Sequence, residues 1–129
     1  MARPQAKHPT ELELEILKVL WKQGALSGRE VRESLAKARR DLTYTSVMTV
    51  LGIMEEKGYV RRKKQEGNFQ YSARLSEKVT TRRMLEDVVK RAYDGSVMAA
   101  MVNLLETGDI DAEEIKQLRK LLKDKPDEV

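Results

Sequence analysis

The chain contains no cysteine among its 129 residues. Disulfide bonds, cysteine nucleophiles and thiolate metal sites are therefore excluded. Histidine is almost as scarce, with one copy, His8. This residue lies in residues 1–9, which we expect to be a flexible arm. The sequence has no phosphate-cradling glycine motif and no set of carboxylates at metal-ligand spacing. It thus predicts a protein that is not an enzyme and that uses no metal or cofactor.

Long apolar runs are also missing. No stretch of 18 or more apolar residues occurs, and residues 1–9 lack the apolar centre of a signal peptide. We therefore expect a cytoplasmic protein with no membrane insertion. The 40% of residues that are hydrophobic can build a modest core, either in one compact domain or in a small domain with an appendage.

Positive and negative charges are unevenly distributed along the chain. Residues 1–75 hold 15 lysines and arginines against 9 acidic residues, a net charge of +6. Residues 76–129 hold 10 against 12, a net charge of −2, so that the formal total is +4. The basic first half favours a polyanionic partner, although charge alone does not identify one. We expect the two halves to have separate functions.

The basic half begins with two predicted helices, each with its own start signal. Thr10 and Glu13 form a capping box at the start of a helix over residues 10–22. Ser27 and Glu30 repeat this pattern at the start of the second helix. Both helices carry apolar residues at helical spacing, so we expect them to pack on a common core.

A third helix, residues 43–57 (TYTSVMTVLGIMEEK), has the most distinctive surface in the sequence, and Thr43 is placed as its N-cap. One face is apolar and is expected to pack inward: Tyr44, Val47, Met48, Val50, Leu51 and Met54. The other face is expected to point outward: Thr45, Ser46, Thr49, Gly52 and Glu56. Because hydroxyl groups can bond base edges or phosphates, we interpret this helix as a DNA recognition helix. A packed helix with short surface residues is the alternative.

After Gly58 the sequence takes on the period of a β-strand. Residues 59–75 predict two short strands joined by a turn at Glu66, Gly67 and Asn68. In the second strand three residues are expected to face inward: Phe69, Tyr71 and Ala73. The first strand carries four consecutive cations: Arg61, Arg62, Lys63 and Lys64. A cationic hairpin beside such a helix is typical of a winged helix, but a solvated edge strand protected by lysines would have the same pattern.

The acidic half predicts three more helices that have little core of their own. Asp94 and Gly95 separate the first from the second, and Gly108 separates the second from the third. The helices have more apolar surface than they can bury alone, so we expect them to pair with a second copy; folding back onto the N-terminal domain is the alternative. The expected dimerisation residues are Met84, Leu85, Val88, Val89, Ala92, Tyr93, Val97, Met101, Val102, Leu105, Ile115, Leu118 and Leu122.

Together these elements predict a mostly α protein with a small β-hairpin wing. We expect a flexible arm at residues 1–9, a winged helix-turn-helix DNA-binding domain at 10–75, a C-terminal three-helix dimerisation region at 76–123 and a flexible tail at 124–129. The third helix would enter the major groove of DNA, while the wing, Arg39 and Arg40 hold the backbone.

Over nearly its whole length the sequence resembles the penicillinase-repressor family, the BlaI/MecI-like winged-helix repressors. The most specific stretch is RRDLTYTSVMTVLGIMEEKGYVRRKKQEGNFQYSA, and the segments ELEILKVLW and AYDGSVMAAMVNLLE are also similar to the family. The resemblance implies a homodimeric transcriptional repressor of the antibiotic response, which binds a palindromic operator in double-stranded DNA. The C-terminal helices would form the dimer.

The resemblance also implies roles for individual residues. Positions that face DNA in relatives correspond to Thr45, Ser46, Met48 and Thr49, and we expect base contacts from Ser46 and Thr49. Met48 stands where some relatives carry an arginine, so direct guanine readout is lost there. The expected DNA contacts are Arg39, Arg40, Thr43, Thr45, Ser46, Met48, Thr49, Arg61, Arg62, Lys63 and Lys64.

In antibiotic-responsive relatives, derepression follows cleavage of the repressor after a membrane sensor protease is activated. The corresponding bond here joins Asn103 and Leu104, and a leucine replaces the usual aromatic residue. The alternative is that Asn103 is an ordinary exposed helix residue. A copper-responsive branch uses a C-terminal cysteine pair, which this chain lacks. Two other functions stay open: a winged-helix module that binds another protein, and a winged-helix regulator that responds to a small ligand.

Overall fold

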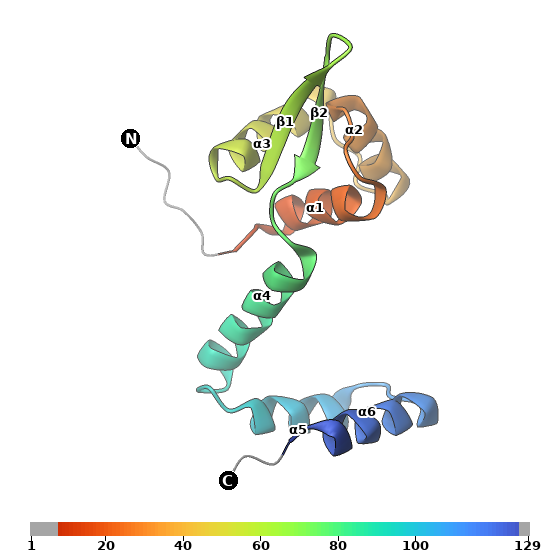
Figure 1. Cartoon of the computed structure of the whole chain (residues 1–129), viewed down its shortest axis with the longest axis vertical. Helices are drawn as coiled ribbons and strands as arrows, with labels where there is room; N and C mark the ends of the chain where they lie inside the picture. Colours follow the sequence, from red (N-terminus) through yellow and green to blue (C-terminus); the bar gives the residue numbers. More distant parts are fainter. Residues whose placement is uncertain (1–7, 127–129) are drawn as a thin grey trace. The chain divides into compact units, whose positions relative to one another are not determined.

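The computed structural model describes residues 8–126, and these form six α-helices and one antiparallel β-hairpin. The elements, in order (Figure 1), are α1 (Glu11–Gln23), α2 (Gly28–Lys37), α3 (Tyr44–Glu56), β1 (Val60–Gln65), β2 (Asn68–Ala73), α4 (Glu77–Ala92), α5 (Val97–Thr107) and α6 (Ala112–Asp124). This confirms the mostly helical fold with a small hairpin. The chain divides into two compact units at Met84 and Leu85, inside α4. Most of the expected arm and half of the expected tail lie outside the described residues.

Three helices begin with the capping boxes that local sequence predicts. The Thr10 side chain accepts a hydrogen bond from the Glu13 backbone N–H, and the Glu13 carboxylate accepts one from the Thr10 backbone N–H at 2.9 Å. The same reciprocal pair starts α2 and α6. Each box satisfies two backbone donors that a helix start otherwise leaves unpaired, so the positions where these helices begin are fixed by neighbouring residues.

The core of the first unit lies between α1, α2, α3 and the hairpin, whose strands pass in front of part of α3 in Figure 1. Its buried members are Ile16, Leu17, Leu20, Leu26, Val31, Leu35, Val47, Leu51, Met54, Val60 and Tyr71. Leu26 joins the hairpin as a one-residue third strand, because its backbone exchanges hydrogen bonds of 3.0 and 2.7 Å with Tyr71. Where β2 ends, the Trp21 indole N–H donates to the Leu75 carbonyl at 2.8 Å. The helix α3 and the wing therefore share one core.

A buried ion pair ties the end of α3 to the start of α1. Lys57, which follows α3, places its Nζ 2.9 and 3.1 Å from the two carboxylate oxygens of Glu13, a side chain that is only 3% exposed. Burial by itself raises the pKa of the Glu13 carboxyl. Hydrogen bonds from the Thr10 backbone and from Lys57 outweigh that effect, so the pKa of Glu13 lies below its usual value of 4.5. The pair thus holds the C-terminal end of α3 in place.

We expect Glu13→Gln to lower the free energy of unfolding of the first unit by about 2 kcal/mol at neutral pH, because Lys57 loses its charged partner. Since the pKa of Glu13 is depressed in the folded protein, its contribution is complete above the unfolded value near 4.5 and is lost as pH falls through the folded pKa. The difference between wild type and variant should therefore shrink below that pH. Urea unfolding followed by the fluorescence of Trp21, the one tryptophan, measures it.

The control for this experiment is Glu11→Gln, which removes an exposed carboxylate from the same helical turn. We expect a small effect at neutral pH, because an exposed group near a helix start contributes only a few tenths of a kcal/mol. A Glu13→Gln difference that stays constant with pH would show that the ion pair does not stabilise the fold.

The hairpin is a regular ladder with a two-residue turn. Cα partners run from Val60 with Ala73 to Gln65 with Asn68. The turn consists of Glu66 and Gly67, both of which have positive φ (51° and 83°), the arrangement of a type I′ turn. The predicted three-residue turn was wrong because Asn68 belongs to β2. Two-residue turns of this type match the twist of the strands that they join.

One inward prediction in the hairpin was also wrong. Tyr71 is buried and Ala73 is half-buried, as predicted, but Phe69 is 42% exposed. It lies near the tip of the hairpin, beyond the reach of the helical core, and the Arg62 guanidinium covers its ring at 4.4 Å from the ring centre. An arginine therefore replaces the core as the packing partner of this aromatic side chain.

The second unit has almost no buried core in a single chain. Among its described residues, Ala100 alone is buried, at 8% exposure. Exposed large apolar side chains occur on all three helices: Leu85, Val88, Val97, Met98, Met101, Val102, Leu104, Leu105, Ile115, Leu121 and Leu122. An apolar recess of about 320 Å³ lies where α4 meets the start of α5. Large exposed apolar patches are rare on monomeric soluble proteins and often mark interaction surfaces.

Candidate nucleic-acid interface

The outward face of α3 carries three exposed hydroxyl side chains, as predicted: Thr45, Ser46 and Thr49. Local hydrogen bonds hold them. The Thr43 hydroxyl accepts from the Ser46 backbone N–H at 3.1 Å and donates to Ser46 Oγ at 2.9 Å. Thr49 donates its hydroxyl hydrogen to the Thr45 carbonyl at 3.0 Å, which leaves its oxygen as an acceptor and its methyl group for apolar contact. The face can therefore offer both polar and methyl contacts to base edges.

Negative charge is absent from most of α3. No charged residue occurs between Thr43 and Met54. At the third helical position α1, α2 and α6 carry a glutamate, whereas α3 has Ser46 and α5 has Ala99. Glutamate at this position favours a helix because it faces the positive end of the helix dipole. Its absence leaves the start of α3 compatible with a phosphate group.

A recess of about 300 Å³ lies between the starts of α2 and α3 and the tip of the hairpin. Tyr44, predicted to pack inward, lines this recess and is 48% exposed, because the first residue of α3 lies beyond the core. Met48 is half-buried, and a Cβ atom at Gly28 would collide with its sulfur, so the two helices approach closely here. Arg29 and Asn68 also line the recess. Neither residue was predicted as part of the interface, although Asn68 was predicted in the turn. The one signal for this close approach in the sequence was Gly28, directly after the Ser27 cap of α2.

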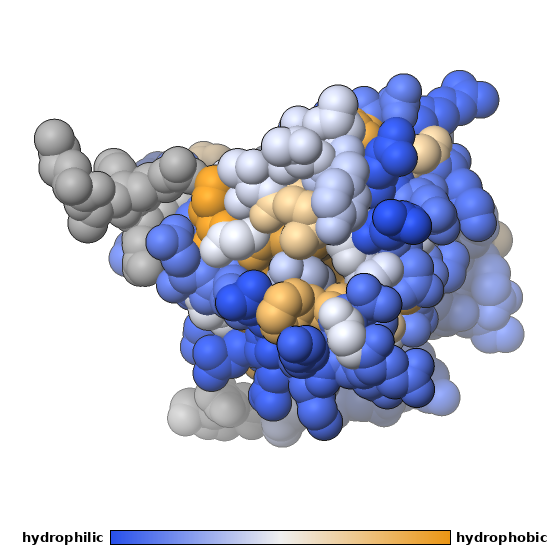
Figure 2. All heavy atoms as spheres, turned by 90° about the horizontal axis from the view of Figure 1, so that it is seen from above, coloured by the Kyte–Doolittle hydropathy of each residue, from blue (hydrophilic) through white to orange (hydrophobic). Residues whose placement is uncertain are grey.

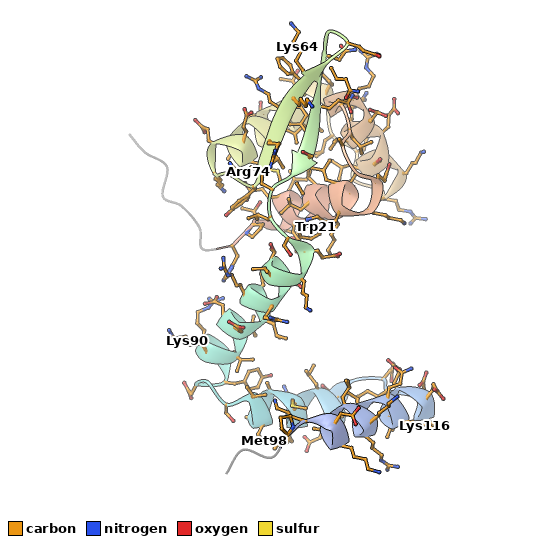
Figure 3. The ribbon with its side chains drawn as sticks, in the orientation of Figure 1. Trp21, Lys64, Arg74, Lys90, Met98 and Lys116 are labelled. Atoms are coloured by element: carbon orange, nitrogen blue, oxygen red, sulfur yellow. The ribbon has the colours of Figure 1, made fainter. Side chains whose placement is uncertain are left out.

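The four wing cations fall on two faces. By the alternation of side chains along a strand, Arg61 and Lys63 share one face, while Arg62 and Lys64 share the face of the buried Val60. All four are exposed, and Lys64 lies near the tip (Figure 3). Seen from the wing end in Figure 2, the surface is mainly hydrophilic.

Arg39 and Arg40 lie at the end of α2, both exposed. Arg39 has a left-handed backbone with φ 65°, and the Arg40 backbone N–H donates to the Leu35 carbonyl at 2.8 Å, which together terminate the helix. The Arg40 side chain reaches α1, where its Nε lies 3.5 Å from a Glu15 carboxylate oxygen. The two arginines line a groove of about 730 Å³ with three further cations that the sequence pattern did not single out: Lys18, Lys22 and Lys37.

The predicted dimerisation residues divide by exposure. Nine are exposed: Leu85, Val88, Ala92, Val97, Met101, Val102, Leu105, Ile115 and Leu122. Four are half-buried: Met84, Val89, Tyr93 and Leu118. The candidate cleavage residues Asn103 and Leu104 are both exposed and lie in the middle of α5, where the Asn103 amide donates to the Tyr93 hydroxyl at 2.7 Å. The bond between them is therefore part of a regular helix.

Residues 8–126 contain neither a metal site nor a membrane span. Within this range no group of three or more histidine, cysteine, aspartate or glutamate side chains is arranged to hold a metal ion. No helix in the same range is both long enough and apolar enough to cross a membrane.

The three-helix core, the uncharged hydroxyl-bearing helix and the cationic hairpin define a winged helix-turn-helix protein. The chain matches the penicillinase repressor family over residues 9–124, and it belongs to that family. It is therefore a transcriptional repressor by family and not an enzyme.

Individual relatives agree with this assignment. The chain is 25% identical to the methicillin resistance regulatory protein MecI of Mammaliicoccus sciuri, over 88% of this chain and 91% of that protein. It is 27% identical to the penicillinase repressor of Bacillus licheniformis, over 89% of each chain. Identity to the transcriptional regulator BlaI of Mycobacterium tuberculosis is 32%, over 87% of this chain and 80% of that protein. The similarity thus includes both the winged-helix part and the C-terminal helices.

Proposed function

We propose that the protein is a homodimeric repressor in the cytoplasm that binds a palindromic operator in double-stranded DNA. The observation that carries the proposal is the surface of α3, which presents hydroxyl groups without any acidic residue before Glu55. In this proposal α3 enters the major groove, with base contacts from Ser46 and Thr49. Cations of the wing, together with Arg39 and Arg40, neutralise backbone phosphates.

The exposed apolar surface of the second unit supports the homodimer. Among the described residues 85–126, one side chain is buried. The second unit therefore adds little stability to the protein unless a partner covers its apolar surface. A second copy supplies the same surface, as the two-fold symmetry of a palindromic operator requires. The α4–α6 helices are therefore proposed as the dimerisation region.

Selection of duplexes from a randomised pool by the full-length protein tests the proposal. We expect the enriched duplexes to carry an inverted repeat and to bind at least about a thousandfold more tightly than random duplex of equal length. The logarithm of the affinity should fall linearly with the logarithm of salt concentration, by about 0.9 for each phosphate contact. Equal binding of selected and random duplex at every salt concentration would reject operator recognition.

For derepression we propose cleavage between Asn103 and Leu104 by a membrane sensor protease, as the family resemblance implies. Both residues are accessible, but proteases bind extended chain, so this part of α5 must open before it is cut. Mass mapping of the repressor recovered from induced and uninduced cells tests this. Fragments that end at Asn103 in induced cells are expected; an intact chain in derepressed cells would favour a small ligand instead.

A further inference from the structure

The wing touches the end of α3 through one of its four cations. Arg62 Nε lies 3.3 Å from a carboxylate oxygen of Glu55, which belongs to the last turn of α3. The same guanidinium covers the ring of Phe69 on the second strand, at 4.4 Å from the ring centre. Arg62 therefore connects the end of α3, β1 and β2 through two contacts, an ion pair and a cation–π contact.

The pairing register separates Arg62 from two of the other cations. Arg61 and Lys63 lie on the opposite face of the hairpin, across from Ser72 and Gln70. Within residues 8–126 neither Arg61 nor Lys63 forms an ion pair, whereas the charge of Arg62 is compensated by Glu55. A compensated cation contributes less to the attraction of a polyanion than an uncompensated one.

We infer that Arg62 is a positioning residue that holds the wing against the end of α3, and that Arg61 and Lys63, on the opposite face of the hairpin, supply phosphate contacts in its place. The inference rests on the proposed function. An exposed ion pair adds little to the stability of a fold. We expect this ion pair instead to fix the position of the wing relative to α3, because both must contact one duplex at the same time.

The sign of one substitution distinguishes positioning from ordinary electrostatics. Removing a carboxylate from a DNA-binding surface normally tightens binding, because it removes repulsion from phosphates. If Glu55 positions the wing through Arg62, Glu55→Gln weakens operator binding instead, by about three- to tenfold. Its exposed neighbour Glu56 is the matched control, and Glu56→Gln should leave the affinity unchanged or raise it.

The salt dependence of binding gives an independent readout. Arg61→Gln and Lys63→Gln should each reduce the log–log salt slope by about 0.9 for every phosphate that is no longer neutralised. Arg62→Gln should weaken binding as much as Glu55→Gln does, with little change in slope, and the double substitution of Glu55 and Arg62 should be no worse than either single one. These measurements use the full-length protein on the selected operator.

Two results would overturn the inference: tighter binding by Glu55→Gln, or a slope for Arg62→Gln that falls as it does for Arg61→Gln. Failure of the proposed function is a different result, in which wild type does not prefer the selected duplex. In that case the contact between Glu55 and Arg62 is still measured by a double-mutant cycle on urea unfolding followed by Trp21 fluorescence. A favourable coupling energy, small as for other exposed ion pairs, supports the contact without DNA, and a zero or unfavourable coupling contradicts it.

Discussion

Replacing Ser46 and Thr49 together by glutamate is expected to weaken operator binding roughly 100-fold or more at low salt, without loss of the fold. Both side chains are exposed on the face of α3 that we propose to enter the major groove. Two carboxylates on that face would meet the phosphates of both DNA strands and would remove the hydroxyl contacts to base edges. Titration of wild type and variant on the selected operator measures the effect.

The structure explains why this variant should stay folded. Ser46 occupies the third position of α3, after the Thr43 cap, where α1, α2 and α6 have the glutamate of a capping box. Ser46→Glu therefore completes a favourable helix start, and Thr49 lies in solvent. Because the variant retains the fold, weaker binding reports on the DNA-facing surface and not on unfolding.

A matched control separates local from overall charge. Thr81→Glu with Gln117→Glu makes the same change in net charge at exposed positions of α4 and α6. This control should lose only a small part of the affinity, since neither residue belongs to the proposed interface. Operator binding equal to that of wild type would show that this face of α3 is not the DNA interface. Repression of the target by a variant that no longer binds the operator would favour the protein-binding alternative.

Leu105→Asp is expected to dissociate the proposed homodimer. In one chain Leu105 is 54% exposed, so the substitution has little effect on a monomer. In a symmetric dimer it acts twice, at about 2 kcal/mol for each buried copy. The total of about 4 kcal/mol corresponds to roughly a thousandfold weaker dimerisation. Sedimentation equilibrium over a range of protein concentrations measures the change.

Gln117→Asp is the control for this substitution, because it adds the same charge to an exposed position of α6 outside the predicted apolar set. It should leave the dimer intact. Dissociation of the dimer should also reduce affinity for the inverted repeat towards that for a single half-site. Wild-type protein that is monomeric at micromolar concentration, or a dimer unaffected by Leu105→Asp, would show that α5 does not form the interface.

Helix starts and the order of elements could be predicted from the sequence because their causes are local. A capping box needs two residues three positions apart, so Thr10 with Glu13 and Ser27 with Glu30 identify helix starts without any knowledge of the fold. The change of period after Gly58 and the breaks at Gly95 and Gly108 predicted the remaining elements, and the family resemblance agreed with their order. The wing turn was assigned one residue too long, since a two-residue turn with Glu66 in a left-handed conformation has no strong sequence signal.

The exposure of Tyr44 and Phe69 could not be predicted, because it depends on how far the core extends. Tyr44 and Phe69 have the correct spacing for inward positions, but they lie at the start of α3 and near the wing tip, beyond the helices that would cover them. The different roles that we infer for Arg61 and Arg62 also depend on tertiary structure, since only Arg62 lies next to Glu55 of α3. Because residues 61–64 are all cationic, the sequence lacks the alternation of apolar and polar residues that would show which side chains share a face.

The left-handed backbone of Arg39 has a consequence for how this protein changes under selection. Glycine adopts φ 65° without strain, whereas for an arginine this conformation costs about 1 kcal/mol. In a library of variants selected for thermal stability alone, glycine should therefore be enriched at position 39. In one screened for silencing of the target promoter, arginine should persist, because glycine cannot replace the guanidinium that we propose to neutralise a DNA phosphate. The residue found at position 39 would then indicate whether selection acted mainly on stability or on repression.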